Sequence, residues 1–186
     1  EEGHKTTLLC HLGNIALQSK RIEEAEALHR EAAEFRRRND LSKPLGVSLS
    51  ALGSVALTQG DYATALKYFG EAESVLSAAD AEPWDLSLAY LGKGRALRRL
   101  GELSLSIKAL RAALEAAEGR RETLDGATVR LELAKGLLAL DQDQGALEEA
   151  RKAHFQLSLA EETSILGDAE LLLGRILFKQ KELPAA

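Results

Sequence analysis

Residues 52–66, with the sequence LGSVALTQGDYATAL, contain a glycine within an apolar helical pattern, then a turn, then a second apolar pattern. Gly60 follows the last periodic residue of the first pattern, and only glycine enters the left-handed backbone region without steric cost. Asp61 comes next, where a carboxylate can cap the following helix and favour its positive end. The stretch therefore predicts a helix, a short turn and a second helix.

The same pattern recurs along the whole chain. Small residues stand at equivalent positions separated by 40, 41, 40 and 40 residues, namely Gly13, Gly53, Gly94, Ala134 and Gly174. Twelve positions beyond each of them come Ala25, Ala65, Ser106, Ala146 and Ala186. One pair of helices cannot bury both of its faces, so stacked pairs form a continuous core. We predict a single all-α array with repeats at about 5–40, 41–81, 82–121 and 122–161 and a partial fifth at 162–186.

The two small positions of each copy resemble those of the tetratricopeptide repeat (TPR) family. The period of about 40 exceeds the family's usual value of about 34, and the segment IEEAEAL at residues 22–28 is similar to longer-period versions in kinesin light chains and bacterial regulators. The resemblance covers nearly the whole chain and implies a right-handed α-solenoid without catalytic activity. The family's aromatic residue in the first helix is replaced by Leu9, Leu49, Tyr90, Arg130 and Glu170.

In this family the first helices line a concave groove, and the residue after each small position is expected to face it. We therefore predict a peptide-binding groove formed by Asn14, Gln18, Ser54, Arg95, Arg99, Lys135, Arg175 and Lys179. Arginine pairs bidentately with carboxylates, which suits a peptide partner with an acidic segment. A second interpretation stays open, in which acidic side chains fold back from the second helices and the basic stripe is solvated.

The family's chaperone-binding members hold a terminal carboxylate with lysines and asparagines spread over three repeats. Asn14 matches one of these positions, but the others are occupied by Cys10, Ala51, Leu88 and Gly92. We therefore do not expect this chain to bind chaperone tails.

The sequence contains no arrangement typical of an active site or a metal site. It has no nucleophile elbow, and the glycines of residues 92–95 fall inside a helical pattern, so they do not form a phosphate loop. Cys10 and His11 point about 100° apart on a helix, which disfavours a shared metal with His4. We predict no catalytic residue, no metal and no cofactor, and we expect His29 to be partly buried and hydrogen-bonded between helices.

Charge and hydropathy narrow the class of partner. A formal net charge of −5 argues against direct binding of nucleic acid. No apolar stretch approaches the roughly 18–20 residues that cross a bilayer, so we expect no membrane span and a cytoplasmic location. The chain does not begin with methionine, and Leu183–Ala186 would open a further helix. We expect a fragment of a longer protein that can form a homodimer through its uncapped terminal helices.

Three functions are compatible with these observations. The leading one is a non-catalytic scaffold whose groove binds a peptide segment of another protein. The second is a peptide-sensing domain of a bacterial transcriptional or signalling protein, which flanking domains would identify. The third is structural spacing or self-association, which predicts concentration-dependent dimers and no ligand in the groove.

Overall fold

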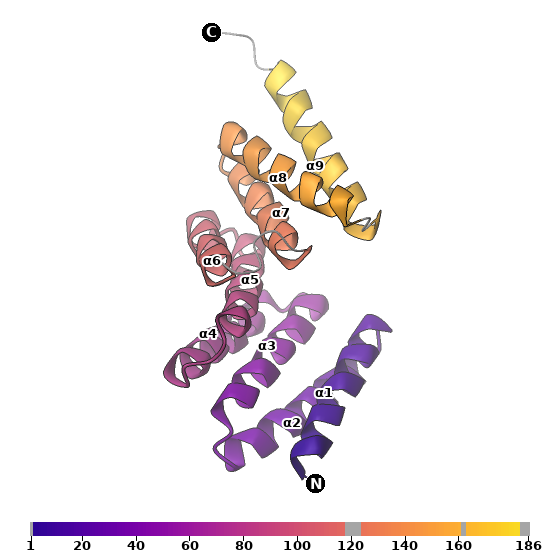
Figure 1. Ribbon diagram of the computed structural model, residues 1–186, viewed down its shortest axis with the longest axis vertical. Helices are drawn as coiled ribbons and strands as arrows, with labels where there is room; N and C mark the ends of the chain where they lie inside the picture. The colour runs from indigo at the N-terminus through magenta and orange to yellow at the C-terminus, as the bar shows by residue number, and fades with distance from the viewer. Residues whose placement is uncertain (1, 118–123, 161–162, 183–186) are drawn as a thin grey trace.

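The computed structural model describes residues 2–117, 124–160 and 163–182, and over these ranges it consists of α-helices without a strand (Figure 1). The helices are α1 (Glu2–Gln18), α2 (Ile22–Arg38), α3 (Ser42–Gln59), α4 (Tyr62–Ala78), α5 (Pro83–Arg99), α6 (Leu103–Ala116), α7 (Leu124–Ala139), α8 (Asp143–Leu159) and α9 (Thr163–Glu182). The predicted all-α solenoid is confirmed. The helix expected to begin at residue 183 lies outside the described residues.

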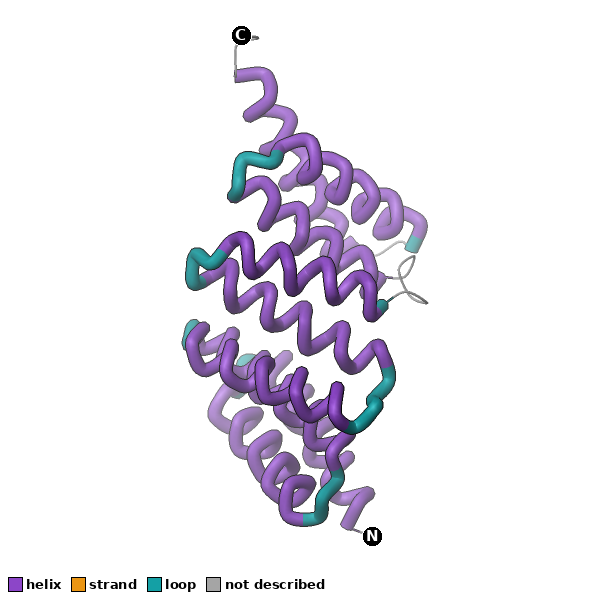
Figure 2. Tube along the Cα trace, turned by 90° about the vertical axis from the view of Figure 1, so that its left-hand side faces the viewer, coloured by secondary structure: helices purple, strands orange, loops and turns teal. Residues whose placement is uncertain are grey.

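The helices form a stack in which each one packs against the next along the chain (Figure 2). The first helices of successive pairs, α1, α3, α5, α7 and α9, also contact one another in order. This row of first helices forms one side of the array, and it carries the groove described below.

Two of the turns have the predicted glycine chemistry. Gly60 and Gly101 adopt φ values of 81° and 85°, in the left-handed region. Asp61 caps α4 as expected, because its Oδ1 accepts a hydrogen bond of 3.1 Å from the backbone N–H of Thr64. Glu102, at the equivalent place before α6, makes no such bond, which agrees with the preference of N-caps for shorter polar side chains.

Glycine in the first helices permits close helix contacts, as the repeat pattern predicted. A Cβ atom on Gly13 would lie 2.7 Å from Nε2 of His29, and one on Gly53 would lie 2.8 Å from Cζ of Phe69. A Cβ on Gly92 of α5 would come within 2.1 Å of the same Phe69 ring. Phe69 on α4 is therefore held between α3 and α5.

His29 corrects one expectation from the sequence. Its side chain is 0% exposed, and within the described part of the chain neither ring nitrogen has a hydrogen-bond partner. The expected partial burial and hydrogen bond were both wrong, because Gly13 lets α1 approach so closely that the ring is sealed from water and from polar groups. Burial, assisted by the charge of Arg36, lowers the pKa of His29 below its usual 6.5.

Candidate functional site

The first helices line three adjoining hollows that together make one groove. The N-terminal hollow, of about 240 Å³, lies mainly between α3 and α5. The central hollow, of about 300 Å³, is lined by residues from α1 to α7 and shares Ser54 and Arg95 with its N-terminal neighbour. The C-terminal hollow, of about 620 Å³, lies between α7 and α9 and shares Arg98 with the central one.

Most of the residues predicted for the groove line these hollows. Those that do so are Asn14, Ser54, Arg95, Arg99, Lys135, Arg175 and Lys179. Gln18 is exposed near the end of α1 and lines none of the three hollows. Helical spacing therefore placed seven of the eight predicted residues beside these hollows, whereas the role of all of them in binding stays a prediction.

A buried carboxylate lies among the cations at the junction of the central and C-terminal hollows. The Glu132 side chain is only 8% exposed, and its Oε2 accepts a hydrogen bond of 2.9 Å from Arg98. Its Oε1 accepts one of 3.1 Å from Lys135 and lies 3.7 Å from Nε of Arg95. One carboxylate thus serves three cations contributed by α5 and α7.

The charges of this cluster keep Glu132 ionised. Burial by itself raises the pKa of the Glu132 carboxyl, but the nearby cations Arg95, Lys135 and Arg98 outweigh burial and lower the pKa below its ordinary value. At neutral pH the cluster therefore holds one negative and three positive charges, and its surplus positive charge borders the groove.

The sequence analysis missed Glu132. One of its two interpretations had acids of second helices reach the basic stripe, as Asp143 of α8 does for Lys179, but Glu132 belongs to a first helix, α7. Two signals were present: Glu132 precedes Lys135 by three residues, which places both on one helix face, and the equivalent residues of the preceding two repeats are Ala51 and Gly92. Positions that hold small residues in other repeats are closely packed, so a carboxylate at such a position is buried and needs a nearby cation.

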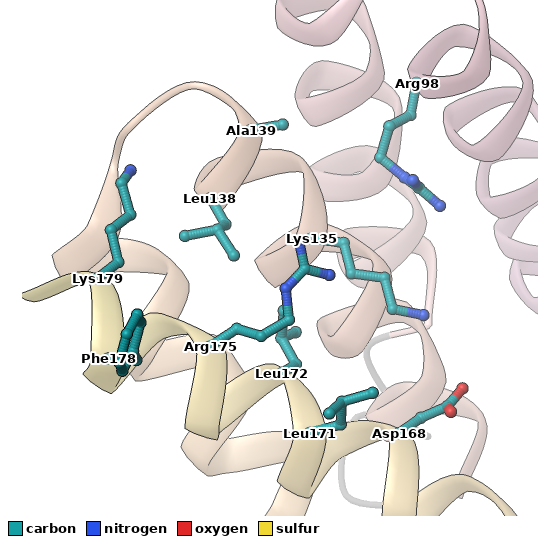
Figure 3. Close-up of a pocket in the computed structure, with 10 residues that line it drawn as sticks. All are labelled: Arg98, Lys135, Leu138, Ala139, Asp168, Leu171, Leu172, Arg175, Phe178 and Lys179. Atoms are coloured by element: carbon teal, nitrogen blue, oxygen red, sulfur yellow. The ribbon is translucent and has the colours of Figure 1, made fainter.

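The two predicted cations of α9 differ in their surroundings. Lys179 donates hydrogen bonds to Oδ1 of Asp141 at 2.6 Å and to Oδ1 of Asp143 at 2.7 Å, and these bonds raise the pKa of its ammonium group. Arg175 makes no hydrogen bond or ion pair to any described residue, and its side chain reaches from α9 toward α7 (Figure 3). Arg175 is therefore available to a ligand, whereas Lys179 already has partners.

The C-terminal hollow combines these charges with apolar surface. Leu171 and Phe178 of α9 are 66% and 63% exposed, and both line the hollow together with Leu138 and Leu172 (Figure 3). The sequence analysis did not name them. Phe178 follows Gly174 by four residues, just as Leu138 follows Ala134, so helical spacing could have placed both on the groove face.

No group of three or more His, Cys, Asp or Glu side chains within residues 4–117, 124–160 and 165–181 is arranged to hold a metal ion. Among the helices of the described ranges, none offers an apolar stretch of the length that spans a bilayer.

Comparisons with known proteins agree with this architecture. Two family models, both described as tetratricopeptide repeat, match residues 5–78 and 88–119, which together are more than half of the chain. The fold is similar to that of BtubC (BKLC) from P. vanneervenii, with a TM-score of 0.78 and 16% identity over 90% of this chain and 70% of that one. It is also similar to a variant of nearly identical TPR-like repeats from a putative kinesin light chain of Podosopora anserina, with a TM-score of 0.78 and 15% identity over 98% and 89% of the two chains. No curated protein sequence matched the chain.

Proposed function

The chain belongs to the tetratricopeptide repeat family, and we propose that it is a non-catalytic module that binds an acidic segment of another protein in the groove of its first helices. TPR repeats indicate a protein–protein interaction scaffold. The observation that carries the acidic preference is the surplus of positive charge in the half of the groove formed by α5, α7 and α9. Arg95, Arg98 and Lys135 share one carboxylate, and Arg175 has no described partner.

Charge and shape support this ligand class together. The chain as a whole carries a net charge of −5, so cations gathered on one face oppose its overall charge and can attract a negative segment. Side-chain carboxylates of a bound peptide can pair with Arg175 and Lys135, while its apolar side chains cover Leu171 and Phe178. The helices that form the groove pack directly against their neighbours in the stack, so most of the ordering cost of binding falls on the peptide.

Charge reversal in the groove tests the proposal. The variant Arg95→Glu, Lys135→Glu, Arg175→Glu is compared with a control, Lys67→Glu, Lys108→Glu, Arg151→Glu, which alters exposed cations that line none of the groove hollows. Circular dichroism verifies that both variants keep their helix content. Binding partners are captured from cells of origin, and the bound segment is identified by crosslinking and mass spectrometry.

We expect the unaltered protein and the control to capture the same acidic segment and the groove variant to lose it. Raising the salt concentration should release the segment, because salt screens exposed charges. A synthetic copy of the segment should lose affinity when its Asp and Glu residues are replaced by Asn and Gln. Capture by the groove variant at an unchanged level would contradict the proposal.

Self-association is a second candidate, favoured by an apolar row on α1. Leu12 and Ile15 are 43% and 52% exposed, whereas their equivalents inside the stack, Leu52 and Val55, are buried. A second copy of the chain would bury this row. Sedimentation velocity over a concentration series tests the candidate: we expect dimers for the unaltered chain and monomers for Leu12→Gln, Ile15→Gln. A chain that stays monomeric at every concentration would exclude it.

A further inference from the structure

We propose that the central hollow is a subsite for a phosphoryl group carried by a phosphorylated side chain of the bound peptide. The inference rests on the proposed function, because the same groove receives the peptide. Arg95, Arg98 and Arg99 all line this hollow, and their spacing of three and four residues places them on one face of α5. Three guanidinium groups from a single helix thus border a space of about 300 Å³.

The hydrogen-bond donors of these arginines are largely unused within the protein. Arg98 donates to Glu132, but Nε of Arg95 lies 3.7 Å from that carboxylate, beyond the length of a hydrogen bond. The Cζ of Arg99 lies 5.9 Å from the centroid of the Tyr62 ring, and this side chain makes no ion pair to a described residue. The unpaired N–H groups of Arg95 and Arg99 can therefore serve the three acceptor oxygens of a phosphoryl group.

Charge favours a phosphoryl group over a carboxylate. Four cations lie beside Glu132 or line the central hollow, namely Arg95, Arg98, Arg99 and Lys135. The single negative charge of Glu132 compensates only one of these four positive charges. A ligand carboxylate adds one negative charge, whereas a phosphoryl ester adds about 1.5 to 2. The buried Glu132 carboxylate lies on the α7 side of the central hollow, where it repels an anion. A bound phosphoryl group is therefore expected on the opposite side of the hollow, next to Arg95 and Arg99.

The surroundings favour a peptide over a nucleotide as the carrier of the phosphoryl group. The central hollow adjoins both other hollows, so an extended chain can enter and leave it. Tyr62 is the aromatic residue among those that line the hollow, and Arg99 already lies over its ring, which leaves less aromatic surface for a base to stack on. The volume is at the small end of the range of about 300–1,000 Å³ found for small-molecule sites, which suits one side chain.

The test uses N-acetyl-O-phosphoserine amide as the probe, at constant ionic strength. N-acetyl-glutamate amide supplies the carboxylate comparison and adenosine monophosphate the nucleotide comparison. The readout is the Nε–Hε NMR signals of ¹⁵N-labelled arginines, assigned by single variants. We expect saturable shifts of Arg95, Arg98 and Arg99 with phosphoserine and none for Arg151, which is exposed on α8. The glutamate probe should bind about tenfold more weakly, as expected when charge-assisted hydrogen bonds are lost.

Two sets of variants distinguish specific binding at the subsite from non-specific attraction to the positive charge of the protein. Arg95→Gln, Arg99→Gln should weaken phosphoserine binding about tenfold or more, whereas Arg151→Gln should leave it unchanged. Arg98 is retained because it is hydrogen-bonded to Glu132. Glu132→Gln should tighten phosphoserine binding, because it removes the competing anion.

The pH dependence provides an independent readout. Phosphoserine affinity should fall as the pH decreases from 7 to 5, since the second pKa of a phosphate ester is about 6. The lowered pKa of Glu132 keeps that carboxylate ionised over the same range.

Three results would overturn the phosphoryl subsite: equal affinity for the glutamate and phosphoserine probes, equal shifts at Arg151, or tighter binding of the nucleotide. The proposed function would remain, and the subsite would be excluded, if an unphosphorylated acidic peptide bound at Lys135 and Arg175 with the same affinity in the Arg95→Gln, Arg99→Gln variant. Absence of every anionic ligand from the groove would exclude both.

Discussion

The first pair of helices, α1 and α2, and the later first helices, α5, α7 and α9, differ in where they place their titratable side chains. In the first pair, His29 and Arg36 are buried between helices, and the groove position Asn14 is neutral. In the later repeats the groove carries the cations, and the residues equivalent to His29 are apolar, such as Leu110, which packs on Gly94. The same backbone contact therefore accepts a histidine, a phenylalanine or a leucine.

This difference shows that core and groove are chemically independent within one repeat scaffold. A core side chain must fit the slot left by a small residue on the facing helix, so its shape is constrained. Groove positions such as Arg95 and Lys135 remain partly exposed, so packing permits a change of charge there. The groove can consequently acquire a basic half without a change in fold.

The largest expected effect concerns Phe69, which connects the two regions. Its ring is 1% exposed and lies against Gly53 of α3 and Gly92 of α5. Replacing it with alanine leaves a cavity between the neutral and the basic parts of the array, and we expect a loss of about 3–5 kcal/mol in the free energy of unfolding. Urea denaturation measures the loss. The control is Phe155→Ala, on an exposed phenylalanine, and equal losses for both variants would contradict the assignment.

Glu132 provides the next largest effect, and this one is confined to the basic half. Glu132→Gln keeps the shape but removes the charge that holds Arg95, Arg98 and Lys135 together. We expect a loss of about 1–2 kcal/mol at low salt, reduced from the usual value because the cations are partly exposed. Denaturation in low and high salt measures it.

The pH dependence of the same variant has a definite direction. Because the folded-state pKa of Glu132 lies below its ordinary value of 4.5, its stabilising contribution is complete above pH 4.5 and is lost as the pH falls through the lowered pKa. The unaltered chain and Glu132→Gln should therefore differ most above pH 4.5 and converge below it. A difference that stays constant with pH would show that the charge of Glu132 is not its source.

His29 is a titratable group in the core, in contrast to Glu132, which borders the groove. Its folded-state pKa lies below 6.5, so below that pH the unfolded chain binds a proton that the folded chain does not. Stability should fall between pH 7 and 5 by at most about 1.4 kcal/mol per pH unit. His29→Leu, which copies Leu110, should flatten this dependence in thermal unfolding. His11→Leu, on an exposed histidine, is the control, and an unchanged slope in His29→Leu would contradict this account.

The sequence predicted the parts of the molecule that depend on periodic local constraints. Glycine spacing gave the stacked pairs and the left-handed turns at Gly60 and Gly101, because each of these features needs a residue without a side chain at a fixed place. Helical spacing also placed Arg95 and Lys135 on the groove side. These features follow from one repeat at a time.

The features that were missed depend on contacts between helices. The sealing of His29 depends on how closely α1 approaches α2, and the role of Glu132 depends on arginines 34 and 37 residues away on another helix. The pairing of Lys179 with Asp141 and Asp143 joins α9 to the turn before α8 and to the first residue of α8. Periodicity identifies the face on which a residue lies, but not the side chain it meets across the next helix.

Lys179 and Arg175 give the smallest expected effect on stability and a useful contrast in binding. Lys179→Ala breaks two ion pairs, and although Asp143 is only 15% exposed, Lys179 is 35% and Asp141 85% exposed, so the midpoint of denaturation should change only slightly. Arg175→Ala should not change it, because this side chain has no described partner to lose.

Binding of the acidic segment should show the reverse order, with Arg175→Ala weakening affinity more than Lys179→Ala. Fluorescence anisotropy of the labelled segment compares the two variants. Equal losses of affinity would mean that Asp141 and Asp143 release Lys179 to the ligand, and that the basic half of the groove extends to the end of α9.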